Sequence, residues 1–197
     1  MSTAAGNDAD GRMMSGGRQV VELVPVGTVP DEVLDHLLQA IEARFPRSVA
    51  RLASHSLMPP EDAYDPARRQ YRAEPILARL DELPTRAERV LGVADLDLYE
   101  PGLNFIFGQA HVGGRVAVVA LARLRPEFWG RPPDQRRFLE RAAKEAIHEL
   151  GHAYGLSHCP NSICVMHFSN TLEETDRKSD RFCGVHEADL LRIVQRD

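Results

Sequence analysis

The sequence lacks several features that would assign it to a common class of protein. It has only three cysteines among 197 residues, which allow at most one disulfide. No apolar run approaches the roughly 20 residues needed to span a bilayer. The net charge is −5 and the pI about 5.9, so the chain has no basic surplus of the kind that binds nucleic acid or anionic membranes. We therefore expect neither a nucleic-acid nor a membrane partner.

The N-terminal segment has no hydrophobic stretch either. Residues 1–17 are small, polar and glycine-rich, so we expect a disordered tail without a secretory signal. Without an export signal the default location is the cytoplasm, where thiols stay reduced. All three cysteines lie between positions 159 and 183, and a tight cluster of reduced cysteines is typical of metal ligands.

What the chain does contain is typical of a folded globular protein, because hydrophobic residues make up 43% of it and charged residues 27%. Its length suits one domain. We expect residues 18–197 to form a single domain, with 18–155 as the larger N-terminal part and 156–197 as a smaller, irregular C-terminal part. The oligomeric state is not visible in the sequence, and a monomer is favoured.

Hydrophobic periodicity predicts strands and helices that alternate in the first half of the chain. Strands are expected at 20–26, 48–57, 89–99, 104–112 and 115–124, and helices at 30–45 and 67–83. The last two strands should form a hairpin across Gly113 and Gly114. The first of them is polar enough for a sheet edge, whereas the second is almost continuously apolar, as in a strand buried on both faces. This pattern predicts an α+β fold with a mixed, twisted sheet and helices packed on it.

The strongest helical pattern covers residues 134–154. A broad apolar stripe follows the helical period there, and Gly155 is a natural C-terminal breaker. Arg136, Arg137 and Arg141 are interpreted as a solvated face of this helix. Beyond it the chain shows little regular pattern until a short final helix near the C-terminus.

The end of this helix carries the pattern H-E-x-x-H-x-x-G-x-x-H, which reads HELGHAYGLSH from His148. His148 and His152 are four residues apart and lie on one helix face. Glu149 lies about 100° around the helix, too far round to crowd a metal but close enough to reach a metal-bound water. Gly155 can adopt φ > 0 and return His158 as a third ligand. The alternative, surface histidines on an amphipathic helix, would produce the full pattern in only about one such chain in ten thousand.

Three histidine ligands leave one coordination position open for water, as in catalytic zinc sites. Zinc brings the pKa of such a water near 7, and Glu149 would accept its proton. The water would then attack a carbonyl carbon that the same ion polarises. The motif therefore predicts a zinc-dependent hydrolase, and most simply a metallopeptidase that cleaves peptide bonds.

The cysteines and one further histidine form a second candidate set. Cys159 directly follows the third histidine, Cys164 lies further on, and Cys183-Gly-Val-His186 completes the set. Three thiolates and one imidazole can hold a structural zinc ion in tetrahedral geometry, which would order the irregular C-terminal part. The sequence thus predicts two zinc ions per chain. The alternatives are buried free cysteines and, for His186, a solvent-facing position at the start of a helix.

Together these residues resemble one family closely. The string HELGHAYGLSHC-x4-C-x-M, followed by Cys183, is similar to the archaemetzincin (archaelysin) branch of the metzincin zinc metallopeptidases. Segments such as DPARRQY, LNFIFGQA and FSNTLEETDRK also resemble it, so the resemblance covers most of residues 20–190. It implies a metzincin-like mixed sheet, an active-site helix and a small zinc-stabilised C-terminal subdomain with a Met-turn.

The resemblance also implies roles for individual residues. The implied catalytic ligands and base are His148, His152, His158 and Glu149, and the second zinc is implied at Cys159, Cys164 and Cys183. Met166 would form the Met-turn. The family's fourth ligand to the second zinc is usually a cysteine, and His186 stands here instead. Some metzincins have a tyrosine after the Met-turn that stabilises the oxyanion; His167 and Phe168 stand here, and His167 is interpreted as a bystander.

A peptide or protein substrate is expected to add as a further strand along the edge strand at 104–112. Gln109 and His111 are candidate contacts, with exposed loop residues as the favoured alternative. The competing function is a catalytically weak or inactive zinc-stabilised protein that binds peptides or regulates, which the intact Glu149 argues against. A hydrolase of non-peptide amides would need a closed pocket. The sequence does not fix the physiological substrate, the side-chain preference, or the choice between internal cleavage and end trimming.

Overall fold

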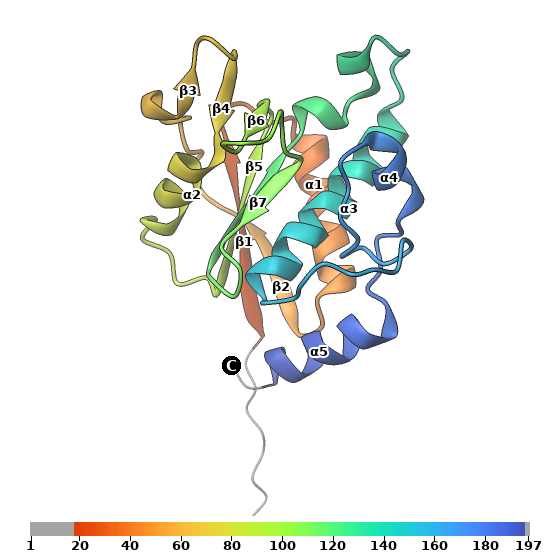
Figure 1. Cartoon of the computed structure of the whole chain (residues 1–197). Helices are drawn as coiled ribbons and strands as arrows, with labels where there is room; N and C mark the ends of the chain where they lie inside the picture. Colours follow the sequence, from red (N-terminus) through yellow and green to blue (C-terminus); the bar gives the residue numbers. More distant parts are fainter. Residues whose placement is uncertain (1–17, 196–197) are drawn as a thin grey trace, which may run out of the picture.

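The computed structural model describes residues 18–195, and the tail expected at 1–17 lies outside the described residues. Within this part, the larger sheet has five strands in the order β2-β1-β5-β8-β7 (Figure 1). Its strands are β1 Gln19–Val26, β2 Ser48–Leu52, β5 Arg89–Ala94, β7 Gly108–Ala110 and β8 Val116–Ala120. The first four in spatial order pair in parallel, and β7 runs antiparallel to β8 at the edge. The predicted α+β fold with a mixed sheet is confirmed.

Helices cover both faces of this sheet. The helices are α1 Asp31–Arg44, α2 Ala73–Asp81, α3 Gln135–Ala153, α4 Leu172–Arg177 and α5 Gly184–Val194, with short 3-10 helices at Glu61–Ala63, Ala122–Leu124 and Pro126–Trp129. Helices α1 and α3 pack on one face and α2 on the other (Figure 1). Successive residues of a strand point to opposite faces, so β8 divides its side chains between the two layers. Ala117 and Val119 join the core under α1 and α3, whereas Val116 and Val118 join the core under α2.

A three-stranded sheet lies beside the larger one. Its strands are β3 Tyr64–Asp65, β4 Gln70–Arg72 and β6 Leu98–Tyr99, in the order β3-β4-β6. The helix predicted at 67–83 is wrong over 67–72, because residues 66–69 form a turn and 70–72 form β4, in which Tyr71 and Arg72 pair with β6. Helix α2 therefore begins only at Ala73, and Pro75 falls in its first turn, where a missing N–H breaks no helical hydrogen bond.

The single strand predicted at 89–99 is interrupted, because β5 and β6 belong to different sheets. Two aspartates between them bind arginines. Asp95 accepts a hydrogen bond from Arg125 at 2.7 Å, and Asp97 accepts two from Arg123 at 2.6 and 2.9 Å. These ion pairs hold the chain where it passes from one sheet to the other. The strands predicted at 48–57, 104–112 and 115–124 are also shorter in the structure.

Helix α3 forms where the sequence predicted a helix. The Asp134 side chain caps the start of α3 by accepting a hydrogen bond from the Arg137 N–H. Just beyond the end of the helix, Gly155 adopts φ +91° and turns the chain away. Arg136 and Arg137 are exposed, as expected. Arg141 is not, since only 1% of it is accessible to solvent. The prediction of a solvated arginine face is therefore wrong at this position.

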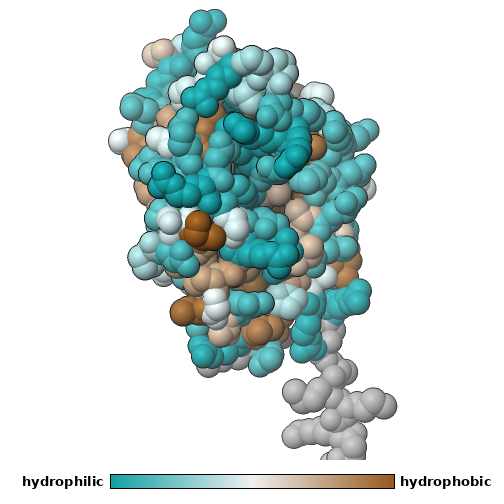
Figure 2. All heavy atoms as spheres, turned by 90° about the vertical axis from the view of Figure 1, so that its right-hand side faces the viewer, coloured by the Kyte–Doolittle hydropathy of each residue, from teal (hydrophilic) through white to brown (hydrophobic). Residues whose placement is uncertain are grey.

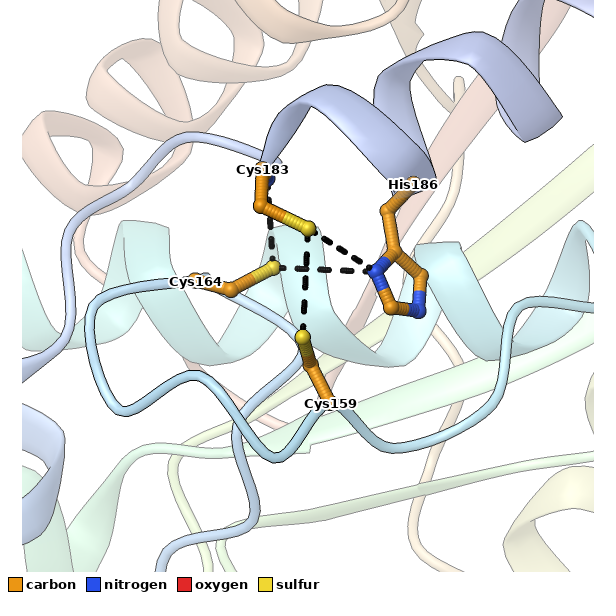
Figure 3. A group of neighbouring side chains, drawn as sticks. All are labelled: Cys159, Cys164, Cys183 and His186. Carbon is orange, nitrogen blue, oxygen red and sulfur yellow. Dashed lines mark hydrogen bonds between the residues drawn. The ribbon is translucent and has the colours of Figure 1, made fainter.

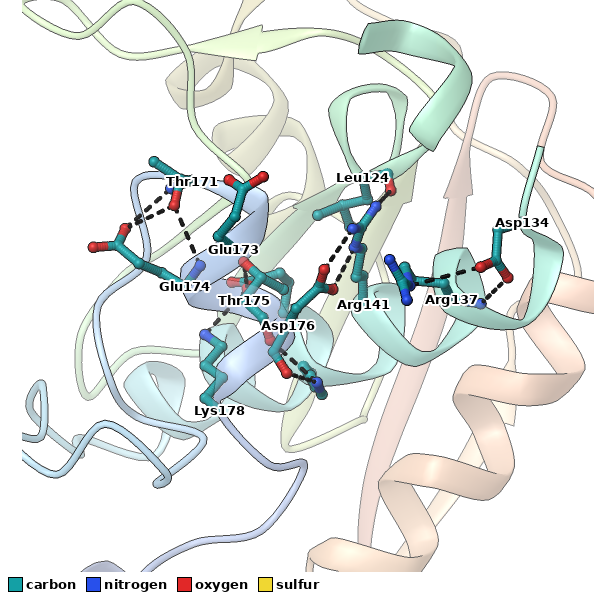
Figure 4. Close-up of polar contacts among 12 residues, drawn as sticks. Leu124, Asp134, Arg137, Arg141, Thr171, Glu173, Glu174, Thr175, Asp176 and Lys178 are labelled. Carbon is teal, nitrogen blue, oxygen red and sulfur yellow. Dashed lines mark hydrogen bonds and ion pairs between the residues drawn. The ribbon is translucent and has the colours of Figure 1, made fainter. Parts of the chain in front are cut away.

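Arg141 is buried because the C-terminal part of the chain folds against α3 (Figure 4). Its Nε and Nη2 donate to the two carboxylate oxygens of Asp176 at 2.7 Å each, and its Nη1 donates to the Leu124 carbonyl at 3.1 Å. Asp176 lies on α4, a helix that the sequence analysis did not predict. A capping box begins it, in which the Thr171 and Glu174 side chains each accept the other's backbone N–H. The T-x-x-E pattern of this capping box was the sequence signal that could have predicted α4.

A second buried ion pair attaches the same segment to α3, one turn further along. Lys178 Nζ lies 3.1 Å from Glu145 Oε1, and Thr175 Oγ1 donates to the same oxygen at 2.9 Å. All three residues are buried, and breaking one half of a buried ion pair leaves an uncompensated charge. Residues 171–178 are therefore held against α3 by side-chain contacts and by no strand of either sheet.

The face that carries α4 and α5 is largely hydrophilic, with hydrophobic side chains scattered mainly over its lower half (Figure 2). Ile163, Val185 and Leu191 are among the exposed hydrophobic residues of the C-terminal segment. Scattered apolar residues of this kind are ordinary on a protein surface. None of the helices among residues 18–195 is long and apolar enough to cross a membrane.

We expect Arg141→Leu to lower the free energy of unfolding by about 2–4 kcal/mol, because it leaves the Asp176 carboxylate and the Leu124 carbonyl without their donor. Arg136→Leu removes the same charge from an exposed position of the same helix and should change this free energy by less than about 0.5 kcal/mol. Urea unfolding of the two variants and the parent measures the difference. Equal effects of the two substitutions would contradict the role assigned to Arg141.

Candidate metal centres

Three histidines converge where α3 ends. His148 and His152 lie on consecutive turns of the helix, and their Nε2 atoms are 3.1 Å apart. The chain then turns at Gly155, whose N–H donates to the His152 carbonyl at 2.8 Å. His158 follows, with its ring centroid 4.7 Å from that of His152 and 5.3 Å from that of His148. The helix and the turn together bring the three imidazoles to one place.

Backbone carbonyls fix the orientation of two of these rings. His148 Nδ1 lies 2.8 Å from the Val165 carbonyl, and His152 Nδ1 lies 2.7 Å from the Leu156 carbonyl. A carbonyl only accepts, so each Nδ1 carries the proton and each Nε2 keeps a lone pair. Two such lone pairs facing each other repel unless a cation lies between them. Zinc–nitrogen bonds of about 2.0–2.1 Å in tetrahedral geometry would place the two nitrogens roughly 3.3 Å apart, so this donor set fits zinc.

The environment keeps the imidazoles neutral, which is the form that binds a metal. Burial lowers the pKa of His148 well below its usual value, and the nearby Lys178 ammonium and His152 add to the effect. Burial is also the largest cause of the lowered pKa of His152 and His158. The three ring nitrogens are therefore available as ligands at neutral pH.

Glu149 is buried between α3 and the edge strand β7. Gly108 of β7 faces it so closely that a Cβ added to Gly108 would lie 2.7 Å from Glu149 Oε1. Burial raises the pKa of Glu149 well above its usual value, the neighbouring Glu145 carboxylate raises it further, and the Lys178 ammonium opposes the shift. A carboxylate with a raised pKa is suited to accept and return a proton near neutral pH. The role of Gly108 was missed in the sequence, although a glycine within a strand can signal a close approach of this kind.

The second cluster comprises Cys159, Cys164, Cys183 and His186, and Figure 3 shows their side chains pointing toward one another. One ligand atom from each lies within 4.8 Å of all the others. The Cys159 and Cys183 sulfurs are 3.8 Å apart, and all three cysteines are free. Zinc–sulfur bonds of about 2.3 Å in tetrahedral geometry would separate two sulfurs by roughly 3.8 Å. The spacing therefore fits a zinc ion and is far longer than a disulfide bond.

His186 is oriented as a ligand. Its Nε2 lies 3.1 Å from the Ser157 carbonyl, so this nitrogen carries the proton and Nδ1 keeps its lone pair. Nδ1 faces the cysteines, 3.3 Å from Cys183 Sγ and 4.0 Å from Cys164 Sγ. The alternative of a solvent-facing histidine at a helix start does not describe this ring.

The cysteines of this cluster differ in acidity. Cys183 caps the start of α5, where the His186 backbone N–H and then the His186 ring lower the pKa of its thiol to about 6. Burial raises the pKa of the Cys164 thiol to about 11. Cys183 therefore ionises readily, whereas Cys164 needs a compensating cation to become a thiolate.

The turn at Cys164–His167 connects the two clusters. The His167 N–H closes it by donating to the Cys164 carbonyl at 2.9 Å, and the Met166 carbonyl accepts the Cys159 N–H at 2.8 Å. Met166 is fully buried, with its sulfur against Gly151 of α3, where any Cβ would collide with it. The methionine thus lies under the helix segment that carries the first two histidines.

A cleft of about 530 Å³ opens beside the three histidines and Glu149. Its walls come from the loop and strand at 102–110, from α3, and from residues 168–170. Gln109 lines it, and Gln109 Oε1 is buried without a hydrogen-bond partner among the described residues. His111 is not among the lining residues; its Nε2 lies 3.4 Å from Glu74 on α2, so a substrate contact is not supported for it. His167 is also outside the lining, with its Nδ1 2.9 Å from the Cys159 carbonyl.

Comparisons with known proteins converge on one family. A family model described as Peptidase family M54 matches residues 40–192. The archaemetzincin of Pyrococcus furiosus is 48% identical over 171 residues, which are 84% of this chain and 89% of that protein. The crystal structure of archaemetzincin from Methanopyrus kandleri superposes with a TM-score of 0.80 at 38% identity, covering 93% of this chain and 98% of that one. A zinc-dependent peptidase from Methanocorpusculum labreanum superposes with a TM-score of 0.76 at 30% identity, covering 86% and 99%.

We expect Gly108→Ala to displace the Glu149 side chain and to reduce hydrolytic activity by about a hundred-fold or more, with zinc content unchanged. The added methyl group would collide with the Glu149 side chain, which supplies the three atoms nearest to it. Gly130→Ala is the matched control, because Gly130 is outside the cleft lining and a Cβ there meets nothing within 4 Å, although its φ is positive. Initial rates and metal analysis of both variants decide the matter. Full activity in Gly108→Ala would contradict the close approach.

Proposed function

Because the chain belongs to peptidase family M54, the archaemetzincins, and is therefore a zinc metallopeptidase, we propose the following roles for the residues of its two clusters. His148, His152 and His158 bind the catalytic zinc, and Cys159, Cys164, Cys183 and His186 bind a second, structural zinc. The observation that carries the first assignment is the pair of Nε2 lone pairs that face each other beside Glu149. The chain thus binds two zinc ions.

Glu149 is the proposed general base. When bound, the catalytic zinc supplies a Lewis acid that polarises the peptide carbonyl and makes the attacking water more acidic. Glu149 takes the proton of that water and then passes it to the nitrogen of the leaving amine. Its position against Gly108 keeps the carboxylate within the narrow space between α3 and the edge strand. Met166 supports the helix that presents both groups.

The substrate is proposed to be a peptide or protein that adds as a strand to β7. This strand is the edge of the sheet, so its outer side is open to another extended chain. Gln109 is the proposed polar contact, because its unpaired Oε1 can accept a hydrogen bond from the bound chain. An inactive binding protein is not favoured, since the base, the histidines and an open cleft are all present in the described part of the chain.

We further propose that residues 18–197 act as one metallopeptidase domain, with the segment after Gly155 as its zinc-stabilised part. The three free thiols at ligand distance support a reducing compartment, the cytoplasm, because an oxidising one would favour a disulfide. A monomer is the proposed state. No role for nucleic acid is proposed.

Glu149→Gln tests the catalytic assignment. We expect it to retain both zinc ions and the fold, and to cleave peptides at least about a hundred-fold more slowly, because an amide cannot accept the proton. The parent and the variant are incubated, zinc-loaded, with a mixed peptide library, and mass spectrometry identifies the products. Cleavage at equal rates would refute Glu149 as the base.

Metal content tests the second cluster. We expect two zinc ions per chain in the parent and one in His186→Ala, whose remaining ion is the catalytic one. His186→Cys should restore the second ion, because a thiolate can replace the imidazole, and His55→Ala, at an exposed histidine, should keep both. Plasma mass spectrometry gives the counts, and a fall in melting temperature should accompany the loss of the ion. Two tightly held ions in His186→Ala would remove His186 from the ligand set.

A further inference from the structure

Apart from the three histidines, the ionisable side chains that line the cleft are all acidic. The lining residues include the carboxylates Glu100, Glu145 and Glu149, and no lysine or arginine is among those described. Two of these carboxylates have a role already. Glu145 accepts from Thr175 and pairs with buried Lys178, and Glu149 faces Gly108 as the proposed base. Glu100 is left without an assignment.

Glu100 also has an unmet hydrogen-bonding need. Its Oε2 is buried and has no hydrogen-bond partner among the described residues, and the same holds for Gln109 Oε1 and Ser169 Oγ in the walls of the same cleft. A buried acceptor without a donor is costly, and a buried carboxylate oxygen more so than a neutral one. The walls of the cleft thus hold three acceptors that lack a donor, and Glu100 is the acidic one among them.

The position of Glu100 along the cleft follows from the strands around it. Glu100 directly follows β6, whose Leu98 forms an isolated bridge with Ile106, two residues before β7. Further along β7 and its turn, Gly108 faces Glu149 and the Gly113 N–H donates to the His152 carbonyl at 2.9 Å. Glu100 therefore lies toward the end of the cleft beyond Glu149, away from His152.

The walls at this end suit a long basic side chain. Leu103, Phe105 and Ile106 line the cleft between Glu100 and β7, and nearly half of Leu103 is exposed. Lysine and arginine bury their methylene stems on such apolar surface while the charged end reaches a polar partner. A charged donor to a carboxylate forms a stronger hydrogen bond than a neutral donor does.

We propose that Glu100 selects substrates that place a positively charged nitrogen at this end of the cleft, from a lysine or arginine side chain or from a free N-terminal amine. Glu100 thus acts as a specificity-determining residue, and this role rests on the peptide hydrolysis proposed above. The bound cation supplies the donor that Oε2 lacks and neutralises the unpaired carboxylate. A substrate without this charge leaves the Glu100 carboxylate unpaired, so it binds less tightly.

The test is a set of peptides in which a single lysine is moved along a fixed sequence, each paired with a peptide that has uncharged norleucine at that place. We expect the zinc-loaded parent to cleave the lysine peptide about ten-fold more efficiently, as kcat/KM, at one position relative to the cleaved bond. Glu100→Gln keeps the size of the side chain and should bring the ratio of the lysine to the norleucine kcat/KM at that position close to one. Glu61→Gln, at an exposed glutamate that does not line the cleft, should retain the preference.

N-terminal acetylation separates the two sources of the charge. Loss of the preference on acetylation assigns it to the terminal amine, whereas its persistence assigns it to the side chain. Equal rates for lysine and norleucine at every position, with cleavage intact, would overturn the role of Glu100 but not the peptidase function. If the parent cleaved nothing, that function would fail, and fluorescence anisotropy of the labelled peptides would still decide on Glu100: tighter binding of the lysine peptide to the parent than to Glu100→Gln supports it, and equal binding overturns it.

Discussion

The hydrogen bond from His148 Nδ1 to the Val165 carbonyl, 2.8 Å long, joins the two parts of the molecule on which catalysis depends. On one side of it lies α3, which carries two histidines and the base. On the other side lies the turn that carries Cys164 and Met166. His148 can direct its Nε2 toward a metal only while that carbonyl is in place, so the position of the turn sets the geometry of the first cluster. If His148 binds the metal as proposed, the turn that orients its ring must fold before the site can act.

Buried ion pairs with α3 help to hold the C-terminal part in place. The Asp176 carboxylate forms an ion pair with Arg141, and the Lys178 ammonium forms one with Glu145. Both pairs draw on α3, so the helix that presents the catalytic groups also anchors the segment that orients them. A structural zinc would add its binding energy to the same end, because the site does not exist in the unfolded chain. Buried apolar residues such as Val165, Met166 and Leu190 also join this segment to the main core.

The sequence predicted best what depends on neighbours along the chain. The histidines and Gly155 fall within one helix end and one turn, so spacing alone determined how they converge. The sequence was least informative about residues whose partners lie far away in the chain. By sequence alone Arg141 looks like a surface residue, because its partner Asp176 lies 35 positions away in the chain. Gly108 likewise looks like an ordinary strand glycine, because only the packing of α3 places Glu149 against it. His111 was a reasonable candidate on β-strand pattern, but only the packing of α2 shows that it faces Glu74. Pattern identifies which chemistry a residue can perform, whereas tertiary packing decides which partner it meets.

The histidine in the second cluster has a consequence for the first. Four thiolates around a divalent zinc ion would leave a net charge of −2, whereas three thiolates and one imidazole leave −1. Since Cys159 directly follows His158, a zinc ion at the second cluster would bring this charge close to the proposed catalytic ligands. The imidazole also has a second nitrogen, which donates to the Ser157 carbonyl at 3.1 Å. A cysteine at this position would bind the metal but could not make that bond, so His186 ties α5 to the segment that carries the third histidine while it lowers the negative charge beside it.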